Sequence, residues 1–159
     1  MSAQPDDYSV SPVSGRVSEE LRREVAAFWL RHGAIPDAKE ARRRADELVC
    51  VARNGAGELV GVNTAYVSSL RSVEDRYFFY RMFIRPRDRY LHLCSALVRA
   101  AVDTLRERGV SGTTVKGVVL ITENPKLMRD SGRRLLNHLG WRHAGADSRG
   151  LDIWTIDFG

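Results

Sequence analysis

Apolar side chains recur along the chain at two spacings, and each spacing predicts a type of secondary structure. Three segments place them every three to four positions, the period of an amphipathic helix: Ser18 to Gly33, Tyr90 to Arg108, and Asn124 to Gly140. A shorter segment with the same period follows Asp37, a residue type that caps helix N-termini. The pattern therefore predicts four helices.

Apolar or β-branched runs bounded by turn residues predict the strands. These runs are Tyr8–Val13, Leu48–Ala52, Leu59–Val67, Arg76–Ile84, Val115–Thr122, Trp141–Ala146 and Leu151–Phe158. The glycine-containing sequences 54–57 and 147–150 each join two of them as a hairpin. The run that ends at Ile84 is rich in aromatic residues, so we expect a buried and central strand there.

The order of these elements indicates the fold class. It runs strand, two helices, three strands, helix, strand, helix and two strands, with a helix on each side of the strand Val115–Thr122. This order predicts an α/β (α+β) fold with a mixed sheet of about seven strands and helices on its faces. The 159 residues match one domain, so we expect a flexible tail over residues 1–7 and a single domain over 8–159.

Composition narrows the class of protein. Hydrophobic residues make up 43% and charged residues 28%, as in ordinary globular proteins. The chain contains no apolar run of eighteen residues and begins with a polar, acidic segment, so we expect a cytoplasmic protein that does not enter a membrane. Cys50 and Cys94 lack the spacing of a zinc site or a disulfide framework, which predicts free thiols and no metal. The formal net charge of +5 favours an anionic partner.

Two segments resemble motifs of the GCN5-related N-acetyltransferase (GNAT) family. The first, IRPRDRYLHLCSALV, is similar to the family signature V-x-P-x-x-R-G-x-G-x-G/A, with Ile84, Pro86 and Arg89 at the hydrophobic, proline and Arg/Gln positions. Among the small-residue positions of the signature, His92 and Cys94 hold larger side chains. Together with the element order, the resemblance covers nearly the whole chain and implies a mostly antiparallel central sheet flanked by four helices.

The second segment, ENPKLMRDSGRRLLNHLGW, is similar to the family pattern N-x-x-(A/G)-x-x-L-Y-x-x-x-G-F. Leu135, Gly140 and Trp141 are in register with the second half of the pattern. Asn124 is interpreted as its asparagine, although it lies eleven positions before Leu135 where the pattern has six. The position of the family's tyrosine holds Leu136. The second motif therefore matches in spacing from Leu135 to Trp141 and departs at its tyrosine.

The resemblance implies a coenzyme A site at the start of the helix that follows Pro86. In the family, the strand backbone pairs with the pantetheine arm and amides at the helix start hold the pyrophosphate, because helix N-termini favour anions. By position, the cofactor contacts fall on Phe83, Ile84, Arg85, Arg89, Tyr90, Leu91, His92, Leu93, Cys94, Ser95 and Asn124. The His92 and Cys94 side chains add bulk where glycine would let a phosphate approach the backbone closely.

The same resemblance implies transfer of an acetyl or longer acyl group from coenzyme A to an amine, by direct attack in a ternary complex. The reaction needs a route for the amine proton and a group that protonates the departing thiolate. Leu136 cannot be that acid, so we assign the acid to Tyr80. The candidate bases are Glu74 and Asp75 at the start of the strand Arg76–Ile84, and Glu123, of which we favour Glu123. The alternatives are that Glu123 is a solvated carboxylate or helix cap and that Tyr80 packs in the core.

Several other residues could take part in binding or chemistry, and each also has a purely structural interpretation. His92 either donates to a phosphate or lies on the surface. Cys94 either carries an acyl group or packs on its helix, and packing is commoner for a cysteine with no evident base. The arginines of the last helix, Arg129, Arg133 and Arg134, either reach phosphates or an acidic acceptor, or form a solvated basic face.

Three hypotheses for function follow. We favour an acyl-CoA-dependent N-acyltransferase with acetyl-CoA and an unidentified amine as substrates. The alternative is a catalytically impaired GNAT-fold protein that acts as an acyl-CoA-binding or protein-interaction module. The third hypothesis is nucleic-acid binding, suggested by the basic segments Arg42–Arg44 and Arg85–Arg89 and by the arginines of the last helix. Basic charge alone is weak support for it. Exposed strand edges would permit a homodimer.

Overall fold

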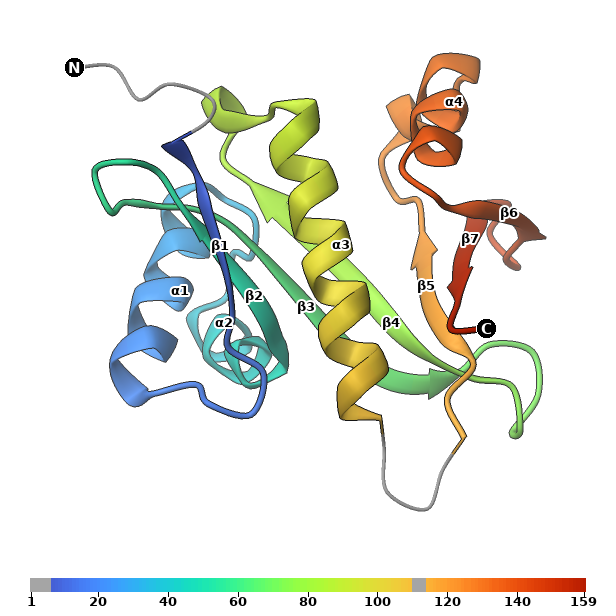
Figure 1. The fold of residues 1–159 in the computed structure, drawn as a ribbon, viewed down its shortest axis with the longest axis horizontal. Coiled ribbons are helices and arrows are strands. Elements are labelled where there is room, and N and C mark those ends of the chain that lie inside the picture. The colour runs from blue at the N-terminus through green and yellow to red at the C-terminus, as the bar shows by residue number, and fades with distance from the viewer. Residues whose placement is uncertain (1–6, 110–113) are drawn as a thin grey trace. The chain divides into compact units, whose positions relative to one another are not determined.

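A computed structural model describes residues 7–109 and 114–159 of the chain (Figure 1). The elements are, in chain order, β1 (Ser9–Pro12), α1 (Glu19–Arg31), α2 (Ala38–Arg44), η2 (Ala45–Glu47), β2 (Leu48–Arg53), β3 (Leu59–Ser69), β4 (Arg76–Ile84), η3 (Pro86–Asp88), α3 (Leu91–Arg108), β5 (Gly117–Ile121), η4 (Pro125–Met128), α4 (Asp130–His138), β6 (Arg142–Ala146) and β7 (Asp152–Asp157), where η marks a 3-10 turn. The predicted order of helices and strands is confirmed.

The strands form a seven-stranded sheet in the order β1-β2-β3-β4-β5-β7-β6. Strand β4 pairs with β5 in parallel, whereas β1–β2, β2–β3, β5–β7 and β6–β7 are antiparallel. The predicted mixed, mostly antiparallel sheet with four helices is therefore confirmed. The aromatic strand β4 is fourth in the order of seven, so its predicted central place is also confirmed.

The chain divides into two compact units. The first comprises Met1–Ala65 and Arg81–Leu105, and the second comprises Tyr66–Tyr80 and Arg106–Gly159. Of the predicted tail, residues 1–6 lie outside the described residues, and a single domain over 8–159 stays a prediction.

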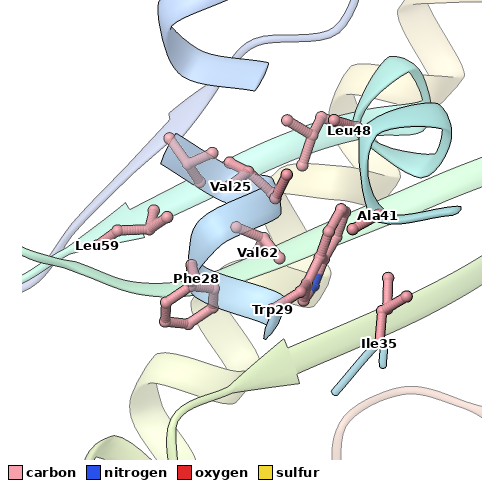
Figure 2. Packing of buried hydrophobic residues seen from close by; sticks show 11 residues of the cluster. Val25, Phe28, Trp29, Ile35, Ala41, Leu48, Leu59 and Val62 are labelled. Atoms are coloured by element: carbon pink, nitrogen blue, oxygen red, sulfur yellow. The ribbon is translucent and has the colours of Figure 1, made fainter. Parts of the chain in front are cut away.

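A hydrophobic core between α1, α2 and the strands β2 and β3 organises the first unit. Ser18 caps α1 through its hydroxyl, which accepts a hydrogen bond of 3.1 Å from the Leu21 amide. Gly33 follows the helix with a φ of +68°, a conformation that glycine adopts without strain. The core residues that Figure 2 labels are Val25, Phe28, Trp29, Ile35, Ala41, Leu48, Leu59 and Val62.

The opposite face of β3 packs against α3 in the same unit. Successive residues of a strand point to opposite faces, so Val62 joins the core beneath α1 while its neighbours Gly61 and Asn63 face α3. The Asn63 side chain is fully buried; its Oδ1 accepts a hydrogen bond of 2.8 Å from the Cys50 amide, and its Nδ2 donates to the Leu97 carbonyl at 3.0 Å. The β2–β3 register shifts just before Cys50, and the Asn63 amide pairs the backbone there.

The second unit is built on β5, β7 and β6 with the first part of β4. Strand β5 pairs along its whole length with β7. The helix predicted to start at Asn124–Pro125 is divided in two, which corrects the prediction: η4 ends, Arg129 adopts an extended conformation with ψ of 161°, and α4 begins at Asp130. At this division α4 turns back and packs against the backbone of η4, and Gly132 lies at the point of contact.

Replacing Gly132 with alanine is expected to destabilise the protein although alanine favours helices. A Cβ at this position would lie 2.5 Å from both the Leu127 Cα and the Lys126 carbonyl oxygen, which are backbone atoms that must shift. Overpacking of this kind costs about 1–3 kcal/mol, more than the gain of about 1 kcal/mol in helix propensity. Urea unfolding measures the change. Ser131→Ala, at the exposed neighbouring position, is the control, and a Gly132→Ala protein as stable as that control would contradict the packing.

Candidate functional site

The end of strand β4 carries the first group of predicted cofactor residues. Ile84 and Arg85 are buried and Phe83 is half-buried. The Arg85 amide donates a hydrogen bond of 2.9 Å to the Val60 carbonyl, which keeps this end of β4 in the sheet. The Ile84 carbonyl accepts a hydrogen bond of 2.8 Å from Arg89 Nε, and the Arg89 guanidinium lies 5.5 Å from the centre of the Phe83 ring.

A tight turn joins β4 to α3. Pro86 opens η3, and the Tyr90 amide donates to the Asp88 carbonyl at 2.8 Å. Helix α3 then begins at Leu91, and its first complete turn is closed by the hydrogen bond of 3.1 Å from the Cys94 amide to the Tyr90 carbonyl. The first-turn amides of a helix have no partners within the helix and carry a partial positive charge.

The side chains of this helix start differ in exposure. Tyr90, Leu91 and His92 are exposed, Leu93 is buried, and Cys94 and Ser95 are half-buried. The predicted cradle from Arg89 to Ser95 thus lies within the first unit as one continuous turn and helix start, of which the first residues face solvent.

A buried charged cluster braces the turn from behind. Arg85 Nε donates a hydrogen bond to Asp88 Oδ2, and the two side chains are only 10% and 8% exposed. The Tyr8 hydroxyl donates to Asp88 Oδ1 at 2.6 Å, and Glu58 Oε2 lies 3.6 Å from Arg85 Nη1. Burial and the hydrogen bond to Asp88 raise the pKa of Tyr8 to about 12, so its hydroxyl stays protonated and remains a donor.

Positive charge concentrates around this segment. Between residues 81 and 99 the chain has five arginines and a single acidic residue, Asp88. Asp88 is committed to Arg85, whereas Arg87 and Arg89 are exposed. A helix start with exposed guanidinium groups beside it suits a phosphorylated ligand.

The two cysteines are free. Burial raises the pKa of the Cys50 thiol to about 11 and also raises the pKa of the Cys94 thiol. Because the thiolate is the nucleophile, both shifts disfavour an acyl-carrying role and support the packing interpretation of Cys94.

The remaining predicted residues lie in the second unit. Tyr80 is only 4% exposed, with its ring 5.7 Å from that of Trp141. Glu123 is exposed just after β5. The Asn124 side chain caps η4 by accepting a hydrogen bond of 3.0 Å from the Lys126 amide. Core packing accounts for Tyr80 and capping accounts for Asn124, so both have a structural role whatever else they do.

The arginines of α4 lie on an exposed face, and one of them is tied to the sheet. Arg133 donates to both carboxylate oxygens of Asp152, at 2.9 and 3.1 Å, and His143 Nε2 lies 3.2 Å from Asp152 Oδ1. The Asp152 side chain is 4% exposed. Arg133 thus joins α4 to β7 through a buried carboxylate.

The Asp152 contacts predict a loss of stability in acid. Hydrogen bonds from Arg133 and then His143 lower the pKa of Asp152 from its ordinary value of about 3.9. A carboxyl group with a lowered folded pKa stabilises the protein above its unfolded pKa, and this stability is lost as the pH falls through the folded pKa. We therefore expect the free energy of unfolding to fall below about pH 4 more steeply in the natural protein than in Asp152→Asn. Urea unfolding at a series of pH values measures this, with exposed Asp130→Asn as the control, and parallel curves for Asp152→Asn and the natural protein would contradict it.

The basic run of α2 is compensated by nearby carboxylates. Arg42 lies 3.1 Å from Glu19, and Arg43 and Arg44 lie 2.6 and 3.4 Å from Glu40. These ion pairs agree with a solvated face. Over residues 7–109 and 114–159, no three His, Cys, Asp or Glu side chains are grouped to hold a metal ion, and no helix there is long and apolar enough to span a membrane.

The hydrogen bond between Tyr8 and Asp88 behind the turn was not predicted from the sequence. Tyr8 and Asp88 are 80 positions apart, and no local pattern connects them. Asp88 did carry a signal, since it is the one acidic residue among the arginines of its segment. The Asn63 amide had a comparable signal as a polar residue inside an apolar strand.

The chain is similar to solved structures of acetyltransferases. A GNAT superfamily phosphinothricin acetyltransferase from Sinorhizobium meliloti, in complex with AcCoA, shares 12% identity at a TM-score of 0.70, with 96% of this chain and 89% of that chain covered. An acetyltransferase of the GNAT family from Streptococcus pneumoniae shares 14% identity at a TM-score of 0.67, with 96% of this chain and 99% of that chain covered. A Salmonella typhimurium protein with its cofactor acetyl-CoA shares 13% identity at a TM-score of 0.63, with 96% of this chain and 93% of that chain covered. No family model and no curated protein matches the sequence.

Proposed function

Because the chain has the fold of the GCN5-related N-acetyltransferases, we propose that it is an acyl-CoA-dependent N-acyltransferase that moves an acetyl group from acetyl-CoA to an amine. The observation that carries the proposal is the segment from β4 to α3, where a strand end, a proline turn and an exposed helix start follow one another among arginines. Two of the similar structures contain acetyl-CoA, which supports the same ligand here.

The residues of the first unit suit the anionic end of such a ligand. The first-turn amides of α3 and the exposed guanidinium groups of Arg87 and Arg89 would share the pyrophosphate. His92 stands where the family signature has glycine, and its imidazole stacks on the Tyr90 ring at a centroid distance of 5.7 Å with both residues exposed.

The strand geometry suits the pantetheine arm. The parallel ladder between β4 and β5 pairs Phe78 with Val118 and Phe79 with Val119, and β4 continues beyond it to Ile84. In the resembling family, the strand backbone past such a ladder pairs with the arm. The Arg85 amide is already bonded to the Val60 carbonyl, and successive residues of a strand direct their amides to alternate sides. Of the predicted residues Phe83, Ile84 and Arg85, we therefore assign this role to the backbone of Ile84.

The transfer itself would form a C–N bond and break the C–S bond of the thioester. The amine nitrogen attacks the thioester carbonyl, the amine loses a proton, and the coenzyme A thiolate gains one. We assign Glu123, which is exposed and available to water, as the base that takes the amine proton. We assign Tyr80 as the acid that protonates the thiolate. Direct attack asks the protein mainly to position the two substrates.

Release of free coenzyme A tests the proposal. The protein is incubated with acetyl-CoA and, separately, with small amines, amino acids and a peptide with a free amino group, and thiol appearance is followed over time. We expect at least one acceptor class to accelerate release. Binding of acetyl-CoA without any acceptor-dependent release would instead favour a non-catalytic acyl-CoA-binding module.

Glu123→Gln separates catalysis from binding. General-base catalysis contributes on the order of 10²–10⁴-fold, so we expect kcat to fall by about 100-fold or more while acetyl-CoA affinity stays unchanged. Glu20→Gln, at an exposed position of α1, is the matched control. Equal kcat values for the two variants would remove Glu123 from the mechanism.

A further inference from the structure

Three rings gather at the start of α3. Tyr90 and His92 are stacked, with ring centroids 5.7 Å apart and planes inclined by 22°. The Tyr8 ring, from the residue before β1, lies 6.0 Å from each of them at 44°. We call these three side chains the ring cluster.

The ring cluster reaches the surface rather than the core. Tyr90 is 42% exposed and the adjacent Leu91 is 49% exposed, which places them among the few large apolar side chains that are exposed in the described part of the chain. His92 is exposed as well. The rings therefore present π surface to solvent at the site where the resembling family has small glycines.

The Tyr8 ring is held in place through its hydroxyl group. The Tyr8 hydroxyl donates to the buried Asp88 carboxylate at 2.6 Å, and Arg85 holds the other carboxylate oxygen. A platform that is already ordered loses little conformational entropy when a ligand binds on it. Arg87 and Arg89, on the turn before α3, place positive charge next to the platform.

An aromatic surface next to a positively charged helix start suits a ligand that carries a nucleobase and phosphates. We propose that the ring cluster is a stacking platform for the adenine base of the acyl-CoA donor, with Tyr90 and His92 as the stacking residues and Tyr8 as the positioning residue. This inference rests on the proposed function. It predicts that the protein selects donors that carry the nucleotide over acyl groups on phosphopantetheine alone.

Paired titrations test the platform. Coenzyme A and 4′-phosphopantetheine, which lacks the nucleotide, are titrated calorimetrically into the natural protein, Tyr90→Leu and Tyr90→Phe. Leucine keeps apolar bulk and removes the ring, whereas phenylalanine keeps the ring. Since stacking on one aromatic side chain changes base affinity by about tenfold, we expect Tyr90→Leu to lower the preference for coenzyme A over phosphopantetheine about tenfold and Tyr90→Phe to leave it nearly unchanged.

The outcomes separate this inference from the proposed function. If the natural protein binds coenzyme A and Tyr90→Leu shows the same preference, the platform is wrong and the cofactor site stands. If both Tyr90 variants lose the preference equally, the hydroxyl rather than the ring matters, which also overturns stacking. If the natural protein binds neither ligand, the proposed function fails and the platform fails with it. Thermal melting without ligand verifies that each variant folds.

Discussion

Replacing Asp88 with alanine is expected to destabilise the protein by about 3 kcal/mol or more, because it leaves the guanidinium of Arg85 buried beside an empty partner position. Arg85 and Asp88 are 10% and 8% exposed at the side chain. Glu58, the other carboxylate near Arg85, is 3.6 Å away and mostly in solvent, so it compensates the charge poorly. The Tyr8 hydroxyl loses its acceptor as well.

A double variant distinguishes the buried charge from lost packing. When both members of a buried ion pair become apolar, the cost is often small, so Arg85→Met combined with Asp88→Leu should recover most of the stability lost in Asp88→Ala. Urea unfolding gives the free energies. An Asp88→Ala protein within about 1 kcal/mol of the natural one, the range of exposed pairs, would contradict a buried pair at the turn.

Replacing Asn63 with leucine is expected to cost about 2–4 kcal/mol, because the Cys50 amide and the Leu97 carbonyl lose a partner inside the core and an unsatisfied buried group costs about 1–3 kcal/mol. The shape of the side chain changes little. Asn63→Asp should cost more, since a carboxylate keeps the Cys50 contact but cannot donate to Leu97 and adds a buried charge.

Chemical denaturation of the two Asn63 variants measures the effect. Asn137→Asp, at an exposed position of α4, makes the same chemical change on the surface and should stay within about 0.5 kcal/mol of the natural protein. If Asn63→Leu is as stable as the natural protein, the amide does not pair the backbone where the β2–β3 register shifts.

The sequence was sufficient where structure follows from local pattern. The 3.6-residue period predicted α3 over Tyr90–Arg108, and the helix observed is Leu91–Arg108. The turn sequence 54–57 predicted the β2–β3 hairpin, which the antiparallel pairing of these strands confirms. Proline at position 86 predicted the end of β4. Each of these depends on residues that are neighbours in the chain.

What the sequence could not supply depends on contacts between distant positions. The Tyr8–Asp88 hydrogen bond and the Asn63–Leu97 contact join different elements, and neither leaves a periodic signal. The division between η4 and α4 depends on how closely Gly132 approaches the preceding turn. At the candidate site, the resemblance identified the helix start from the sequence. The stacking of His92 on Tyr90 depends on side-chain positions, which the sequence pattern does not give.

Calorimetric titration with acetyl-CoA tests the central claim most directly. We expect the natural protein to bind acetyl-CoA with measurable heat and to melt at a higher temperature in its presence, because a ligand that binds only the folded state stabilises it. Arg89→Glu should bind more weakly, since it replaces a positive charge at the start of α3 with a negative one. No heat and no rise in melting temperature at millimolar acetyl-CoA would contradict the acyltransferase proposal and leave the fold unchanged.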